Sequence, residues 1–138
     1  MVLISGTRFR IRSPLYLIMV GWHSYWSYKQ LSRADGFLDS KFLRETNWSV
    51  FWSVTAWKNK SCMNCYKNIG AHRQAMPWLS LMCNEASLVH WEQEDAILPD
   101  WQTVRKRMLE NGRFYNLSNP SKNHVEHYIT FPQISQVE

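Results

Sequence analysis

Long hydrophobic runs, cysteines and glycines are all scarce in this sequence. The longest apolar stretch, residues 15–22, is too short to cross a bilayer. Near the N-terminus Arg8, Arg10 and Arg12 interrupt the apolar residues and no small-residue cleavage site follows, so no signal peptide is expected. Three cysteines are an odd number, which argues against a disulfide framework. We therefore predict a reduced, cytoplasmic protein with no membrane span.

The five glycines are scattered, so no loop is rich enough in glycine to cradle a phosphate. Serine-hydrolase and dinucleotide-binding motifs are missing as well. The formal net charge is +5, but the positive residues are dispersed and accompany no nucleic-acid-binding motif. Nucleic acid is therefore not expected as a partner.

Aromatic residues, in contrast, are abundant. The chain has 138 residues, enough for one domain, and 14% of them are Phe, Trp or Tyr, with eight Trp. That is more flat apolar surface than packing requires, which favours a ligand pocket or an apolar partner surface.

Hydrophobic periodicity and turn residues predict alternating strands and helices. We expect strands at 2–12, 37–43, 49–57 and 86–92, and helices at 14–34, 60–68, 71–83 (with a kink at Pro77) and 99–111. The order is that of an α+β, ferredoxin-like βαββαβ domain with an antiparallel sheet, extended by a C-terminal helix. We place this domain at residues 1–112 and a tail at 113–138, in which residues 127–131 alternate like an edge strand.

The strand at 49–57 is apolar on both faces, with Trp52 on one and Trp57 on the other. Helices on one side of a sheet cover only one face. The second face predicts a second subunit, and hence a homodimer.

Two bulky residues of the first helix, Trp22 and Trp26, share an apolar stripe at helical spacing. Such stripes usually pack in the core. A flat ligand wall is the alternative for these two indoles.

The middle of the chain carries a longer pattern: FWSVTAW at 51–57, YKN at 66–68, GAHR at 70–73, AMP at 75–77 and LVHW at 88–91. It resembles a family of uncharacterised bacterial proteins of the DUF3291 type, related to the antibiotic-biosynthesis-monooxygenase-like superfamily. Spheroidene monooxygenase is distantly similar to the same group. The likeness is strongest over residues 36–92 and absent from the tail.

The resemblance implies a dimeric α+β barrel, in which the sheets of two subunits face each other around apolar cavities. It also implies a small monooxygenase-like enzyme acting on an apolar aromatic or polyene substrate. A non-catalytic protein that binds haem, a pigment or another apolar ligand is the alternative, and a haem-dependent oxygenase is a further one. The cofactor is thus either none or haem, although Met76 stands where the haem-degrading relatives have their ligand histidine.

Within this reading His72 is the candidate base and Arg73 the candidate anion holder. Substrate contacts are expected from Trp22, Trp26, Trp52, Trp57, His90 and Arg10. Structural roles stay open: His72 could brace its helix, and His90 could be a hydrogen-bonded core histidine. The N-terminal arginines could be ion-paired or exposed, because an unpaired charge is not stable in a dry core.

The pair Cys62 and Cys65 forms a CxxC motif. No further ligands lie at the spacing that zinc requires, and no Pro or Gly separates the thiols as in redox motifs. We interpret both cysteines as structural and predict no metal site.

Overall fold

Strands of the computed structural model, which describes residues 1–134, form one antiparallel sheet in the order β2-β3-β1-β4-β5. The strands are β1 (Val2–Ile11), β2 (Phe37–Arg44), β3 (Val50–Trp57), β4 (Cys83–Gln93) and β5 (Arg113–Phe114). The central position of β1, between β3 and β4, is that of the first strand in a ferredoxin-like domain. The predicted α+β fold is confirmed.

The helices also follow the predicted order. They are η1 (Pro14–Tyr16), α1 (Leu17–Leu31), α2 (Lys60–Lys67), α3 (Gly70–Ala75), η2 (Met76–Trp78), α4 (Leu79–Met82), α5 (Trp101–Asn111) and α6 (Lys122–Val125). Ser13 accepts a hydrogen bond from the backbone N–H of Leu15, with Pro14 next to it, so the first helix begins at the expected cap. Pro77 divides the predicted helix at 71–83 into three short pieces, as its missing N–H requires.

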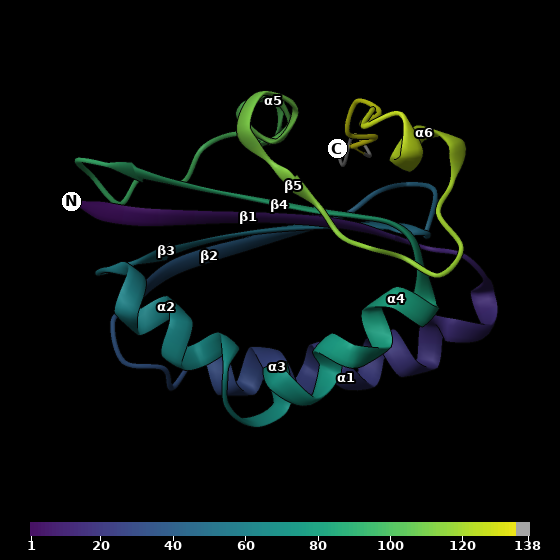
Figure 1. Ribbon diagram of the computed structural model, residues 1–138. Helices are drawn as coiled ribbons and strands as arrows, with labels where there is room; N and C mark the ends of the chain where they lie inside the picture. The colour runs from purple at the N-terminus through teal and green to yellow at the C-terminus, as the bar shows by residue number, and fades with distance from the viewer. Residues whose placement is uncertain (135–138) are drawn as a thin grey trace.

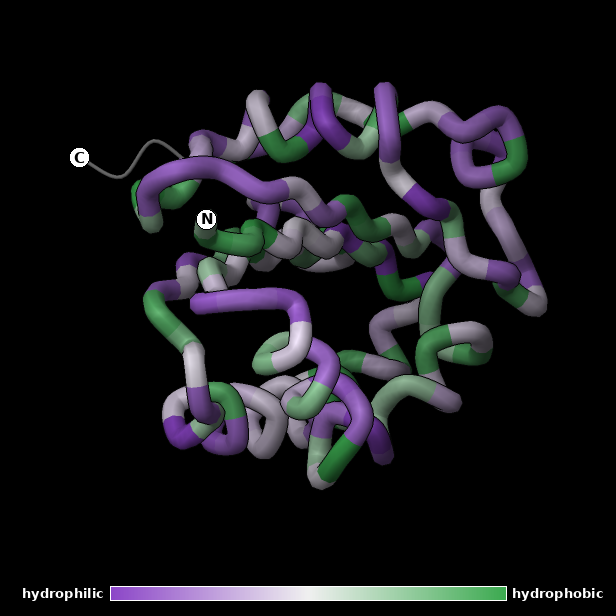
Figure 2. The backbone as a smooth tube through the Cα atoms, turned by 60° about the vertical axis from the view of Figure 1, so that its left-hand side comes forward, coloured by the Kyte–Doolittle hydropathy of each residue, from purple (hydrophilic) through white to green (hydrophobic). Residues whose placement is uncertain are grey.

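Two helical layers enclose the sheet (Figure 1). Helices α1 to α4 lie on one side, and α5 and α6 lie on the other. In Figure 2, α5 alternates hydrophobic and hydrophilic segments, as expected for a helix lying on a sheet. It packs Val104 and Met108 against Trp52, Val54 and other side chains of β3.

The second apolar face of β3 is therefore covered within the same chain. We expected a second subunit there, but α5 and the following segment cover it instead, and they contribute Ile129 to the same core. The two apolar faces of β3 therefore no longer indicate a second subunit, and the homodimer stays a prediction.

The segment after Gly112 packs closely on the domain. Its β5 pairs with β4, and Ser121 caps α6 with its hydroxyl. The prediction of an edge strand at 127–131 is wrong, because this stretch has no strand hydrogen bonding. It is held instead by Arg105, which donates to the carbonyl of Ile129, and by the hydroxyl of Thr130, which accepts from Arg8.

No helix in residues 1–134 combines the length and apolarity that a bilayer crossing needs.

Candidate functional site

A cavity of about 870 Å³ lies between the sheet and the layer of α1 to α4. Strand alternation gives it a roof of small hydroxyl side chains. Ser5 and Thr7 of β1 lie opposite Thr55 and Ser53 of β3, and all four line the cavity. Because these side chains are short, they leave room that bulky residues would fill.

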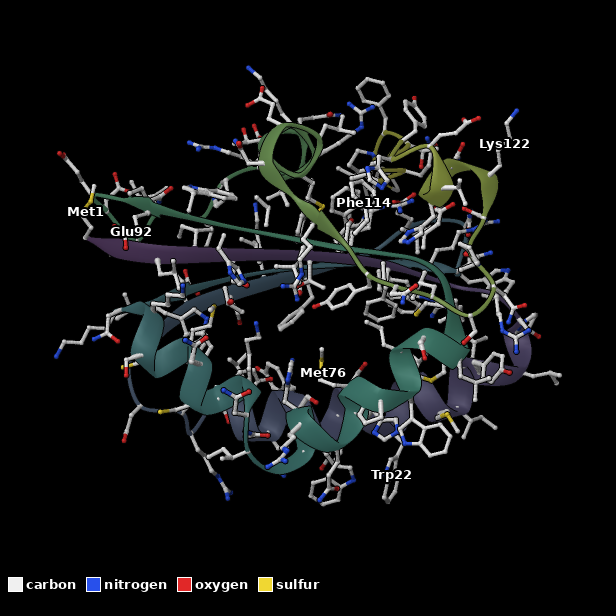
Figure 3. The ribbon with its side chains drawn as sticks, in the orientation of Figure 1. Met1, Trp22, Met76, Glu92, Phe114 and Lys122 are labelled. Atoms are coloured by element: carbon white, nitrogen blue, oxygen red, sulfur yellow. The ribbon has the colours of Figure 1, made fainter. Side chains whose placement is uncertain are left out.

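The walls of the cavity are mostly apolar. Met76 rises from the helical layer toward the sheet (Figure 3), while Gly21 and Ala75 add little bulk on the helical side. The remaining apolar lining includes Phe9, Leu17, Val20, Phe51, Leu79 and Leu88. The volume lies in the range of roughly 300–1,000 Å³ that is typical of small-molecule sites.

His72 lies early in α3 and lines the cavity, as predicted. Its Nδ1 atom is buried and has no hydrogen-bond partner among the described residues. Burial lowers the pKa of this imidazole, a hydrogen bond with the Lys67 backbone opposes that shift, and the Lys67 charge adds to it. The ring is thus neutral near pH 7, and its buried Nδ1 is left without a hydrogen-bond partner in the described part of the chain.

Gln30 of α1 positions this histidine, and nothing in the sequence pattern pointed to it. Its amide nitrogen donates to the carbonyls of Tyr66 and Ile69, at 2.9 and 2.8 Å. Its amide oxygen accepts from the backbone N–H of His72 at 2.9 Å. Gly70 passes beside this amide with a φ of 64°, where a Cβ would lie 3.0 Å from the Gln30 oxygen. One side chain therefore fixes the junction of α2 and α3 to α1.

His90 also faces the cavity, from β4, where it pairs with Ser5. Its pKa falls to about 4, chiefly through burial and further through the charges of Lys67, Lys60 and Arg113. Of the two readings left open for His90, the structure supports a polar group of the pocket.

The aromatic side chains of Tyr66 and Trp57 form a wall of the cavity between the helix that carries His72 and the sheet that carries His90. The Tyr66 ring lies 5.3 Å from Trp57 and 4.8 Å from His72, measured between ring centroids. Its hydroxyl donates to the carbonyl of Ser27, and burial raises its pKa. Trp57 donates its indole N–H to Thr55, so its ring is held against the cavity as expected.

Trp22 and Trp26 lie elsewhere than the prediction of a core stripe or ligand wall placed them, and Trp52 lines the cavity only in part. Trp22 points away from the sheet (Figure 3) and is 64% exposed, and Trp26 is 44% exposed. The buried face of α1 carries Val20 and Leu31 instead. Both faces of this helix are apolar, so periodicity alone picked the wrong one. Trp52 borders the cavity, but its ring packs beside Trp101 of α5, on the other face of the sheet.

The predicted arginines do not reach the cavity either. Arg73 is exposed and is not among the cavity-lining residues. Arg8 and Arg10 lie on the opposite face of β1 from Thr7 and Phe9, and both face Glu85, at 2.7 and 3.6 Å. Arg8 is only 2% exposed, and a charge buried to this extent needs a partner, which Glu85 provides. The structure therefore supports ion pairing for Arg8 and Arg10. Arg12 is exposed and donates to the Leu81 carbonyl and the Tyr16 hydroxyl, so it fits the alternative of an exposed arginine.

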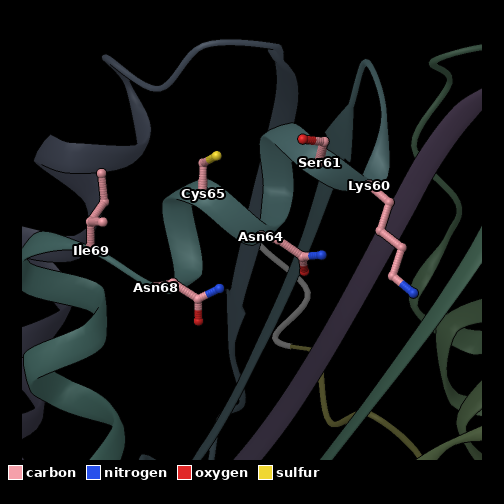
Figure 4. A pocket seen from close by; sticks show the side chains of 6 residues that line it. All are labelled: Lys60, Ser61, Asn64, Cys65, Asn68 and Ile69. Atoms are coloured by element: carbon pink, nitrogen blue, oxygen red, sulfur yellow. The ribbon is translucent and has the colours of Figure 1, made fainter.

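The cysteines form no cluster. Cys62 is half-buried, Cys65 is exposed and Cys83 is buried, and all three are free thiols. Cys65 borders a shallow depression along the outer side of α2 (Figure 4). Within residues 1–134 no three His, Cys, Asp or Glu side chains gather as metal ligands would.

No family model and no curated protein sequence is detectably similar to this chain. Solved structures are similar. SnoaB, a cofactor-independent oxygenase from Streptomyces nogalater, superposes with a TM-score of 0.54 at 14% identity, over 72% of this chain and 98% of SnoaB. The chain has the fold of the antibiotic biosynthesis monooxygenases.

Two proteins described provisionally as antibiotic biosynthesis monooxygenases support this assignment of the fold. The one from Nitrosomonas europaea has a TM-score of 0.59 at 10% identity, over 67% of this chain and 99% of its own. The one from Deinococcus radiodurans has a TM-score of 0.57 at 18% identity, over 72% of this chain and 99% of its own. In this example of the antibiotic biosynthesis monooxygenase fold, the cavity lies between the sheet and helices of one chain. A further cavity between the facing sheets of two subunits stays a prediction, like the homodimer itself.

Proposed function

We propose that this protein is a small monooxygenase-like enzyme that oxidises an apolar aromatic or polyene substrate in the cavity below the sheet. The observation that carries the proposal is the position of His72, which belongs to the cavity wall and whose buried Nδ1 has no partner within the described residues. Burial lowers the pKa of this imidazole, which favours the neutral form that a base requires. A base in a largely apolar site is what proton abstraction from such a substrate requires.

The substrate packs its rings against Trp57 and Tyr66, and the imidazole of His72 accepts a proton from an activated C–H or O–H group. Oxygen then attacks the electron-rich carbon. For a CH2 group between two aryl rings, one oxygen atom becomes the product carbonyl and the other leaves as water, which balances atoms and electrons. The roof hydroxyls of Ser5 and Ser53 are available to donate to the developing oxyanion, a role we had assigned to arginine.

Non-catalytic binding is the alternative from the sequence. Its discriminator is whether titratable groups line the cavity, since proton transfer has no agent without them. The lining includes His72, His90 and Lys67, which favours catalysis.

Haem is the cofactor that the sequence reading left open. His72 and His90 both line the cavity, and a neutral imidazole is the form that binds iron, so the donor set fits. Bound haem would supply an iron that activates oxygen. Adding hemin to the purified protein tests this: a Soret band that shifts in the wild type and is lost in His72→Ala would identify a haem protein.

The primary test uses anthrone, whose CH2 group lies between two aryl rings. Oxygen uptake and anthraquinone formation are followed with the wild type, His72→Asn and the control His127→Asn, an exposed histidine of the tail region. We expect a loss of about 100-fold or more in the first variant and none in the second. Anthraquinone formed no faster than without protein, or equally fast with His72→Asn, would refute this role of the cavity.

Two finer statements belong to the same proposal. The DUF3291-type likeness and the distant likeness to spheroidene monooxygenase suggest a polyene among the substrates to test. A homodimer is proposed on the same ground, and light scattering would measure it directly.

A further inference from the structure

Positive charge from two elements, α2 and β5, lies where the lining of the cavity meets solvent, and we call this part of the cavity its mouth. Lys67, the last residue of α2, lines the cavity and is half-buried. Arg113 of β5 pairs with Leu88, and opposite residues of an antiparallel pair share a face. Leu88 lines the cavity, so Arg113 projects to the same side, with its guanidinium 5.8 Å from the ring of the cavity-lining Tyr115.

These cations are close enough to repel one another. Burial lowers the pKa of Lys67, and the charges of Arg113 and Lys60 lower it further. The same three cations lower the pKa of His90. Lys60 begins α2, one helix length before Lys67, so the positive potential extends along this helix.

No carboxylate of residues 1–134 lies within 4 Å of any of the three cations. Glu92, two positions beyond His90 on β4, makes no such pair either. Arg8 shows the contrast, because this buried cation has Glu85 at 2.7 Å. Lys67 is thus a half-buried charge at a cavity mouth with no counter-ion from the described chain, and such a charge favours an anionic ligand.

We propose that the ligand of this cavity is an amphipathic anion, with an aromatic body under the sheet and one anionic group held at the mouth by Lys67 and Arg113. The proposal rests on the proposed function only in that the cavity binds a ligand. It narrows the substrate class to aromatic or polyene compounds that carry a carboxylate, sulfonate or similar group. Neutral hydrocarbons and pigments could pack under the sheet but would lack the contact of an anionic group with Lys67 and Arg113.

A matched pair of fluorescent probes tests the proposal. 8-Anilinonaphthalene-1-sulfonate and N-phenyl-1-naphthylamine have the same ring body, but only the first carries a charge. Their dissociation constants are measured with the wild type, Lys67→Gln, Arg113→Gln and the control Lys122→Gln, an exposed lysine of α6. A further variant, Ala75→Trp, fills the cavity and shows whether the probes bind inside it.

We expect the sulfonate to bind the wild type about tenfold more tightly than the neutral probe. Lys67→Gln and Arg113→Gln should each remove most of this preference and leave the affinity for the neutral probe within twofold. Lys122→Gln should change neither affinity, and Ala75→Trp should abolish both.

The contrary results separate the two proposals. If the neutral probe binds in the cavity but neither Lys67→Gln nor Arg113→Gln weakens the sulfonate selectively, the anion subsite is refuted and the proposed function stands. If both probes bind Ala75→Trp as tightly as the wild type, they bind elsewhere and the subsite is likewise refuted. If neither probe binds the wild type, the ligand cavity itself is refuted, together with the proposed function.

Discussion

Replacing His90 by Asn should change how the stability of the protein depends on pH. In the folded chain the pKa of His90 is about 4, against an unperturbed value of 6.5. The unfolded chain therefore takes up the proton first as the pH falls. Stability associated with the neutral ring is present in full above pH 6.5 and is lost between pH 6.5 and 4.

The magnitude follows from the two pKa values. Between pH 7 and pH 5 the full shift corresponds to a loss of about 2 kcal/mol in the free energy of unfolding. Water reaches part of this ring, which screens the charges of Lys67 and Arg113, so we expect about 1 kcal/mol. The Asn side chain of His90→Asn does not titrate in this range. Between pH 7 and pH 5 the free energy of unfolding of this variant should therefore fall by about 1 kcal/mol less than that of the wild type.

Urea unfolding at pH 7 and pH 5, followed by tryptophan fluorescence, measures the difference. His127→Asn is the control, since this histidine is exposed, stacks on Phe114 and does not line the cavity. If wild type and His90→Asn lose equal stability between the two pH values, His90 is not held neutral by its surroundings and the electrostatic account of the cavity mouth is wrong.

Three further changes test other parts of the structure. Glu85→Gln leaves the buried charge of Arg8 without its partner and should destabilise the protein by roughly 3–5 kcal/mol in urea unfolding; a change below about 1 kcal/mol would contradict the buried pair. Trp22→Gln should shift the free energy of unfolding by less than about 0.5 kcal/mol and leave probe affinity unchanged, because Trp22 is exposed; loss of probe binding would return it to the ligand site. A chain ending at Gly112 should lose more than the roughly 1.5–3 kcal/mol that burial of Ile129 alone contributes, measured by thermal unfolding, and an unchanged melting temperature would show that the tail is dispensable.

Local sequence signals were sufficient for the order of elements. Ser13 and Pro14 mark the first helix, Pro77 breaks the second helical region, and the β-branched and aromatic residues of β3 form the expected strand. These are effects of nearest neighbours and of single-residue backbone preference, which a sequence contains in full.

Which face of an element is buried was harder to predict. Trp22 and Val20 lie on opposite sides of α1, and both sides are apolar enough to be the core. Likewise the second face of β3 could be covered by another subunit or by α5, and only the packing of Val104 and Met108 decides between them.

The cavity could have been predicted from a pattern that we overlooked. Ser5, Thr7, Ser53 and Thr55 are small and lie at alternate positions in two strands that otherwise carry bulky residues. Small side chains on one face of adjacent central strands indicate space beneath them. Gln30 gave no such signal, because its role depends on three backbone groups distant in sequence.

The most direct test of the central claim measures proton transfer without oxidation. Anthrone is incubated with the protein in deuterated buffer under nitrogen, and incorporation of deuterium into its CH2 group is followed by mass spectrometry. With oxygen absent, only abstraction and return of the proton are observed. The account predicts that the wild type accelerates exchange and that His72→Asn reduces it to the rate in buffer alone. Equal acceleration by both proteins, or none by the wild type, would contradict the assignment of His72 as the base of this cavity.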